Sequence, residues 1–177
     1  MEIQWYFEDL TELFNLNMNG YYILGFLDSA IRDVEKYGIK NATVLCSGVL
    51  LMDLQGLRNF DFTEKIKQFM MSQNNKILKE DQDIINSVLQ GHLYTLPPKY
   101  GMWGFDLFSH ARIHNNVQRP WLKYNESKLK EAFEHPAILH YTASKPFRNK
   151  KAPFDNFWWN YANKTGYYKS IYNYSLN

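Results

Sequence analysis

The chain has 177 residues, of which 45% are hydrophobic, so it is long and apolar enough for one well-buried domain rather than a disordered segment. Its formal net charge of +2 excludes the strongly basic surface that is typical of nucleic-acid-binding domains, and no nucleic-acid partner is expected. The single cysteine, Cys46, excludes an internal disulfide framework and a cysteine-rich zinc site and favours a reducing compartment, so we expect a cytoplasmic location.

The first part of the chain predicts a short helix followed by two buried strands. The helix is expected over residues 9–14, and the strands over the apolar runs 21–27 and 44–52. Ser47 and Gly48 interrupt the second run, and the missing side chain of Gly48 lets another backbone or a ligand approach closely. This interruption is a plausible place for a bound sugar.

Two amphipathic helices follow. The first is predicted to begin at Asp61, because Asp61 and Glu64 form a capping-box pattern ahead of apolar residues at helical spacing. The second is predicted to start near Asp81 and to end at Gly91. Two interpretations of its start are open: Asp81 caps the helix dipole, or Asp81 and Gln82 point into a cleft and bind sugar hydroxyls.

A short strand is then expected over residues 93–96, and a long loop over residues 99–124. Long ordered loops in compact domains are commonly functional. A further helix is expected from Asn125 to Phe133. Because strands and helices interleave along the chain, the fold class is predicted to be α/β.

The apolar run 137–139 predicts another strand, followed by a loop that Pro146 closes. His140 and Lys145 would then lie at the carboxyl edge of a strand, where α/β sheets bind ligands. Imidazole can ligate a divalent cation, and a lysine ammonium acts on phosphate oxygens as a point charge. The segment is a candidate site for a metal-bound diphosphate, and an ordinary strand end with a surface lysine is the alternative.

The last segment, residues 153–176, predicts one or two helices with a dense aromatic face interleaved with lysines. Such a face fits peripheral contact with an anionic membrane, and it fits equally a core-facing helix that is fringed by lysines. No window of the sequence reaches the roughly 20 apolar residues that a membrane span needs.

Five segments occur in a specific order along the chain. They are DLTELF at 9–14, SGVLLMD at 47–53, DQD at 81–83, LPPKY at 96–100 and HYTASKPF at 140–147. In this order and spacing, residues 9–162 resemble glycosyltransferase family 8, the retaining enzymes that include bacterial lipopolysaccharide galactosyl- and glucosyltransferases.

The resemblance implies a GT-A type fold, with a mixed sheet flanked by helices, as one partial domain over residues 1–177. Residues 9–147 would be the catalytic-domain portion, and residues 148–177 an aromatic and basic helical segment. The implied reaction moves a hexose from a UDP-sugar to a glycan or lipopolysaccharide-type acceptor with retention, and Mn²⁺ or Mg²⁺ binds the diphosphate.

The same resemblance implies roles for particular residues. Asp81 and Gln82 would be catalytic residues that hold the donor sugar, with Gln82 near the reacting carbon. Lys145 would contact the diphosphate, and His140 would ligate the metal. The other donor-binding positions would be Ser47, Gly48, Cys46 and Ala143. The metal and the lysine would neutralise charge that grows on the UDP leaving group.

The chain departs from the family at three places. Cys46 stands where the family usually has asparagine, Ala143 stands where it has glycine, and residues 1–8 carry no DxD motif for the metal. We therefore expect the C-terminal part of a family domain, with impaired activity, in the cytoplasm or at the inner face of the membrane. The alternative function is a non-catalytic carbohydrate-binding or interaction module with the same fold.

Overall fold

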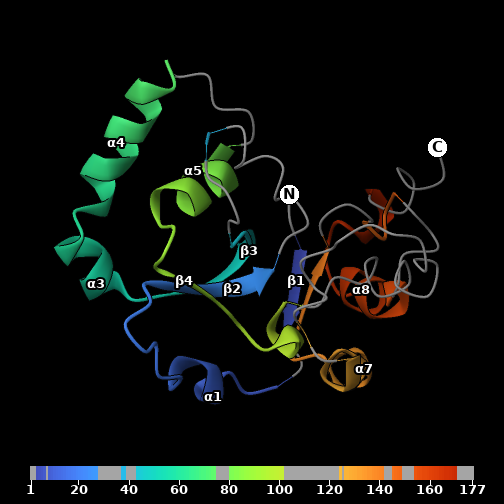
Figure 1. The fold of residues 1–177 in the computed structure, drawn as a ribbon. Coiled ribbons are helices and arrows are strands. Elements are labelled where there is room, and N and C mark those ends of the chain that lie inside the picture. The colour runs from blue at the N-terminus through green and yellow to red at the C-terminus, as the bar shows by residue number, and fades with distance from the viewer. Residues whose placement is uncertain are drawn as a thin grey trace, which may run out of the picture.

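The computed structural model describes residues 3–6, 8–27, 37–38, 43–74, 80–101, 124, 126–141, 145–148 and 154–170. Within these residues the strands are β1 (Ile3–Tyr6), β2 (Ile23–Leu27), β3 (Leu45–Met52), β4 (Leu93–Thr95) and β5 (Ile138–Tyr141). The helices are α1 (Thr11–Phe14), α3 (Leu54–Asn59), α4 (Phe62–Ser72), α5 (Glu80–Val88), the 3₁₀ helix η1 (Pro98–Tyr100), α7 (Glu126–Glu134) and α8 (Asp155–Ala162). The predicted interleaving of strands and helices is confirmed (Figure 1).

β2 is the central strand of a three-stranded sheet with the order β3-β2-β4. It pairs antiparallel with β3 and parallel with β4, so the sheet is mixed as predicted. The register with β3 shifts between Gly25 and Leu27. A Cβ atom at Gly25 would lie 2.8 Å from Cδ2 of Leu50, so the absence of a side chain at Gly25 permits the close packing of these two strands.

The side chains of β2 alternate between the two faces of this sheet. Ile23 and Leu27 pack with Leu89, which directly follows α5, on one face, whereas Leu24 packs with Leu13 of α1 on the other. Figure 1 accordingly shows α4 and α5 on one side of the sheet and α1 on the opposite side. Burial on both faces explains why this segment is apolar throughout instead of alternating.

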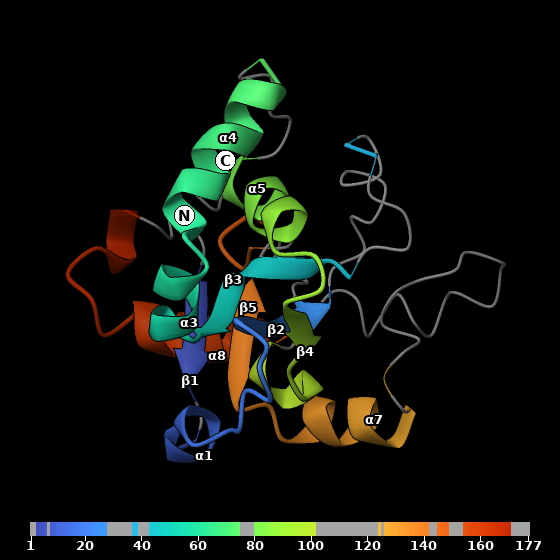
Figure 2. The ribbon, with the colours of Figure 1, turned by 60° about the vertical axis from the view of Figure 1, so that its left-hand side comes forward.

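β1 and β5 form a separate antiparallel pair. Ile138 of β5 belongs to the same buried cluster as Leu24 of β2 and Leu96, which follows β4. The two sheets therefore share a core, and β5 lies beside the three-stranded sheet in both views (Figures 1 and 2). β1 was not expected from the sequence, because the partner that stabilises it lies far away along the chain.

The C-terminal aromatic segment is partly core. Trp158 of α8 is 4% exposed and packs with Leu139 and Tyr141 of β5. The hydroxyl of Tyr141 donates to the carbonyl of Phe154 at 2.7 Å, and burial together with the charge of nearby Asp155 raises the pKa of Tyr141. The core interpretation therefore holds for Trp158. No described helix has the length and apolar character to cross a membrane.

The predicted capping box at Asp61 is wrong. Asp61 adopts a left-handed backbone conformation, with φ of 56°, and its side chain makes no capping hydrogen bond, while Glu64 pairs with Lys67 at 3.2 Å. The carboxylate that does cap a helix is Asp53, which accepts from the N–H of Gly56 at 2.9 Å and begins the unpredicted helix α3.

Candidate functional site

Two predicted donor-site residues meet where α5 approaches β3. The backbone N–H of Ser47 donates to Oε1 of Gln82 at 3.2 Å. Leu45, the first residue of β3, pairs with Leu27 at the carboxyl end of β2, and because the strands are antiparallel, Ser47 lies two residues further into the sheet. β2 and β4 are parallel, and ligands of α/β sheets bind beyond the carboxyl ends of such strands. Ser47 and Gln82 therefore meet on the outer side of β3, close to the end of the sheet where a ligand is expected, and the chain places Cys46 and Gly48 on either side of Ser47.

The acidic residues at the start of α5 accept hydrogen bonds from other groups of the protein. Oδ1 of the exposed Asp81, the second residue of α5, accepts from the backbone N–H of the next residue, Gln82, at 2.9 Å, which is not the contact of an N-cap side chain. Asp83 is buried, and its carboxylate accepts a hydrogen bond from the hydroxyl of Tyr37 at 3.0 Å. A role of Asp81 in holding a donor sugar stays a prediction.

Three amide side chains, two on α5 and one two residues after it, bind the outer edge of β3 and the residue Thr43 that precedes this strand. We call Gln82, Asn86 and Gln90 the amide ladder. Asn86 accepts from the N–H of Leu45 and donates to its carbonyl, both at 2.7 Å. Gln90 accepts from the N–H of Thr43 at 3.2 Å and donates to its carbonyl at 2.9 Å.

Asn86 and Gln90 were not predicted from the sequence as residues of the site. The signal that could have revealed them is the amide residues themselves, which recur every fourth position and so form one stripe along the helix. The apolar stripe of α5 predicts only the face of the helix that packs on the sheet.

Tyr124 closes the carboxyl edge of the parallel strands. Its hydroxyl donates to the carbonyl of Leu96 at 3.0 Å and accepts from the N–H of Leu27 at 3.4 Å. Its ring stacks on Phe26 with 5.3 Å between the ring centroids, and burial raises the pKa of its hydroxyl. Tyr124 thus joins the carboxyl end of β2 to Leu96, which follows β4.

His140 lies at the carboxyl end of a strand, as predicted, but inside the strand and not in the loop that follows it. It is the penultimate residue of β5, stands opposite Gln4 of β1 in the register, and is only 2% exposed. The reason is the pairing of β5 with β1, which extends the strand beyond the predicted run. Lys145 is half-buried and begins a turn, in which its carbonyl accepts from the N–H of Arg148 at 2.8 Å.

The predicted site therefore draws on two sheets. Ser47 and Gln82 belong to the three-stranded sheet and its helix, whereas His140 lies in the β1–β5 pair, which packs on that sheet through Ile138. Ala143 and residues 102–123 of the predicted loop lie outside the described residues.

A metal site is not complete within the described residues. There, no group of three or more His, Cys, Asp or Glu side chains could hold a metal ion. Both ring nitrogens of His140 are buried in the protein. Hard divalent cations need several oxygen ligands, so the residues that the structure describes do not fit a metal ion by themselves.

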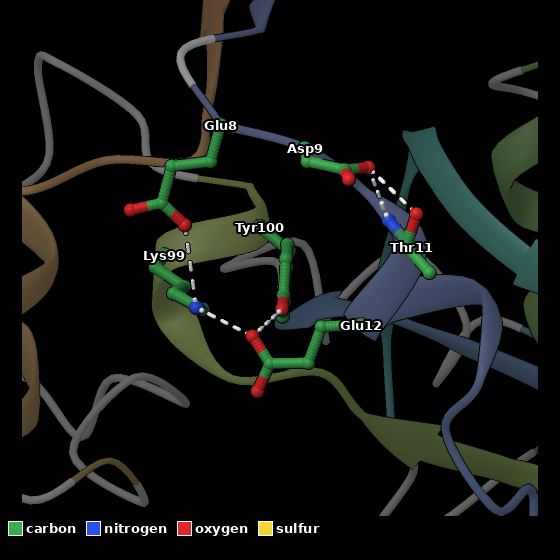
Figure 3. A network of polar contacts seen from close by, with 6 residues as sticks. All are labelled: Glu8, Asp9, Thr11, Glu12, Lys99 and Tyr100. Atoms are coloured by element: carbon green, nitrogen blue, oxygen red, sulfur yellow. Dashed lines mark hydrogen bonds and ion pairs between the residues drawn. The ribbon is translucent and has the colours of Figure 1, made fainter.

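An ion-pair network ties the segment after β1 to η1 (Figure 3). Nζ of Lys99 lies 3.1 Å from Glu12 and 3.4 Å from Glu8, and the hydroxyl of Tyr100 donates to Glu12 at 3.1 Å. The carbonyl of Lys99 accepts from the N–H of Ala137 at 2.9 Å, just before β5. The network and this hydrogen bond therefore join three segments from different parts of the chain: the residues after β1, η1 and the residue before β5.

This network shifts the pKa values of both Lys99 and Glu12. Burial alone would lower the pKa of Lys99, but hydrogen bonds to Glu12 and Tyr100 and the charge of Glu8 outweigh it and raise the pKa. Hydrogen bonds from Lys99 and Tyr100, with the charge of Lys99, hold the pKa of Glu12 below its ordinary value of 4.5.

Replacing Lys99 by methionine is expected to raise the pKa of Glu12 toward 4.5. Because folding lowers this pKa, the stability that the ionised carboxylate contributes is present above about pH 4.5 and is lost as the pH falls through the lower folded value. The side-chain carboxyl ¹³C shift of Glu12, followed against pH, measures this. Lys67→Met, which removes a lysine that pairs with Glu64 instead, should leave Glu12 unchanged. An unaltered Glu12 midpoint in Lys99→Met would contradict the pairing.

The sequence matches the family model described as Glycosyl transferase family 8 over residues 3–151. General stress protein A of Bacillus subtilis is 24% identical over 171 residues, which cover 89% of this chain and 55% of that protein. Lipopolysaccharide 1,2-glucosyltransferase of Escherichia coli is 27% identical over 150 residues, covering 78% of this chain and 40% of that protein. The chain thus spans about half the length of these two relatives.

Two solved structures share the fold. One is the galactosyltransferase LgtC in complex with donor and acceptor sugar analogues, with a TM-score of 0.69, 15% identity, and coverage of 95% of this chain and 62% of that one. The other is the bifunctional glycosyltransferase WbbM, with a TM-score of 0.73, 16% identity, and coverage of 98% and 33%. These matches confirm a GT-A-like α/β fold with a mixed sheet flanked by helices.

Proposed function

Since the chain belongs to glycosyl transferase family 8, we propose that it serves the transfer of a hexose from a UDP-sugar to a glycan or lipopolysaccharide-type acceptor, with retention. The Escherichia coli relative is named a lipopolysaccharide glucosyltransferase, and the LgtC structure holds donor and acceptor sugar analogues. The observation that carries the proposal is the Ser47–Gln82 contact at the carboxyl edge of β2. That contact supports a donor site at the place where the family motifs were expected.

In the proposed mechanism, Gln82 and Lys145 act on charges that grow during the reaction, and the other residues hold the donor. The carbonyl dipole of the Gln82 side chain, held beside Ser47, would stabilise positive charge at the reacting carbon of the sugar. Asp81, at the start of the same helix, would hold the sugar hydroxyls. The ammonium of Lys145 would stabilise negative charge on the departing diphosphate. The backbone at Gly48 would leave room for the donor, with Cys46 and Ala143 at the other donor-binding positions.

A metal is proposed to take part as well. Family 8 members commonly use Mn²⁺, which supplies charge neutralisation at a diphosphate. His140 is the proposed ligand from this chain, and it would act only together with oxygen ligands that the described residues do not supply. No step above is therefore routed through the metal. The expectations of a C-terminal part and of impaired activity stay predictions.

Calorimetric titration with UDP and Mn²⁺ tests the proposal. We expect binding that Lys145→Ala weakens by roughly 10- to 100-fold, the size of a lost hydrogen bond to a charged group. Lys128→Ala, at an exposed lysine of α7, is the matched control and should bind as the unchanged chain does. Because His140 is buried, His140→Gln is preferred to alanine, and it should abolish the dependence of UDP binding on Mn²⁺.

One result would favour the alternative function. An oligosaccharide that binds without nucleotide or metal, together with no UDP binding, would indicate a non-catalytic carbohydrate-binding module. In that case Lys145→Ala would leave the oligosaccharide affinity unchanged.

A further inference from the structure

We infer that Asn86 and Gln90 are positioning residues that hold Gln82 against Ser47, an inference that rests on the proposed role of Gln82 in donor binding. The inference comes from the geometry of the amide ladder, in which α5 and the turn after it take the place of a neighbouring strand along the outer edge of β3 and of Thr43 before it. An edge strand exposes a row of backbone N–H and C=O groups, and here helix side chains satisfy them.

The spacing of the ladder matches the spacing of the strand. Four residues of a helix rise about 6 Å, and two residues of a strand span roughly 6.6 Å. Gln90, Asn86 and Gln82 therefore meet Thr43, Leu45 and Ser47 in turn, with the helix antiparallel to the strand. The short asparagine stands in the middle and the longer glutamines at the ends, which absorbs the small mismatch between the two repeats.

Asn86 is the most constrained member of the ladder. It is 1% exposed, its oxygen accepts from Leu45, and its nitrogen donates to the carbonyls of Leu45 and Gln82 at 2.7 and 2.8 Å. Both amide hydrogens thus have acceptors in the protein. The nitrogen of Gln90 likewise donates to the carbonyl of Asn86, so the ladder is continuous from Gln90 to Gln82.

The ladder sets the direction in which Gln82 points. A slip of one residue along α5 would rotate Gln82 by about 100° around the helix axis, away from Ser47. Such a slip would also leave the N–H and C=O groups of Leu45 without the amide that satisfies them, and unsatisfied buried polar groups are costly. Asn86 therefore acts through the register of the helix on the placement of Gln82.

The variant N86D tests this inference in the full chain, by hydrogen exchange and NMR. The carboxylate keeps the acceptor for the N–H of Leu45 but loses both donors, so Leu45 should stay protected. The Ser47 amide should lose protection by up to about tenfold, which corresponds to one hydrogen bond, and the side-chain resonances of Gln82 should move. Lowering the pH should restore part of the protection, because burial favours the protonated acid, whose O–H can donate again.

Two further variants sharpen the test. N160D changes an exposed asparagine of α8 and should leave Ser47 and Gln82 unchanged. Q90E, at the half-buried end of the ladder, should affect Ser47 less than N86D does, and it keeps the test decisive if N86D fails to fold. A mere loss of stability would lower the protection of Leu45 and Ser47 alike, and would contradict a positioning role.

The inference is overturned if Ser47 and Gln82 respond to folded N86D and Q90E as they do to N160D. Its failure can be told apart from failure of the proposed function. If the unchanged chain binds no UDP-glucose, the proposed function is wrong, yet the exchange data still decide whether the ladder places Gln82. Where hexose transfer is measurable, N86D should lower kcat and leave KM nearly unchanged.

Discussion

Trp158→Ala is expected to lower the free energy of unfolding by about 3–5 kcal/mol, the usual cost of truncating a buried tryptophan. The indole is 4% exposed, packs with Tyr141 of β5, and lies 4.7 Å from Trp159 and 5.7 Å from Phe147 between ring centroids. Its removal would leave a cavity between α8 and β5 that the surrounding rings can fill only in part. Urea unfolding followed by circular dichroism measures the loss.

Tyr167→Ala is the matched control for that experiment. Tyr167 is 75% exposed, so its loss should change the free energy of unfolding by less than about 0.5 kcal/mol. Equal stabilities of the two variants would contradict the packing of α8 against β5.

We also propose that Tyr161 and Tyr167 mediate peripheral contact with an anionic membrane, in which case Tyr167→Ala should reduce co-sedimentation with phosphatidylserine vesicles.

Gln82→Ala is expected to lower the rate of hexose transfer by about 10²–10³-fold, the range that follows loss of one preorganised stabilising dipole. The substitution removes Oε1 of Gln82. This one oxygen is the atom proposed to face the reacting carbon, and it is also the acceptor for the Ser47 N–H. Transfer of labelled glucose from UDP-glucose, by the protein that contains this chain, measures the effect on kcat.

Two companion variants separate the contributions to that loss. Gln82→Glu keeps an acceptor for Ser47, so a smaller loss in this variant would indicate that part of the effect comes from placement of the side chain. Gln68→Ala, at an exposed glutamine of α4, should leave the rate unchanged. If Gln82→Ala transfers hexose as fast as Gln68→Ala does, Gln82 is not a catalytic residue.

Local patterns were sufficient to predict most of the helices and strands. β2 is a continuous apolar run, β3 is an apolar run that only Ser47 and Gly48 interrupt, and α4 and α5 carry apolar residues at helical spacing, so each shows its structure within its own residues. β1 could not be found in this way, because the strand is stabilised by pairing with β5 at the far end of the chain. The cap at Asp61 failed because the backbone conformation, rather than the residue type, decides where a carboxylate points.

In the candidate site, too, the features that depend on distant partners could not be predicted from local sequence. The family resemblance pointed to Ser47 and Gln82, yet their hydrogen bond joins residues 35 positions apart and no local pattern reports it. The burial of His140 follows from the β1–β5 pairing, which the sequence did not reveal. Asn86 and Gln90 were overlooked because a buried amide has meaning only once its partner strand is known.

The most direct measurement is an NMR titration of the ¹⁵N-labelled chain with UDP-glucose in the presence of Mn²⁺. The donor is motivated by the Escherichia coli glucosyltransferase relative. We expect saturable shifts of the Ser47 amide, the Gln82 side chain and the Lys145 amide that share one dissociation constant, since one ligand would span both sheets. Shifts that leave Ser47 and Gln82 unmoved, or that occur only in α8, would contradict a donor site at the carboxyl edge of β2.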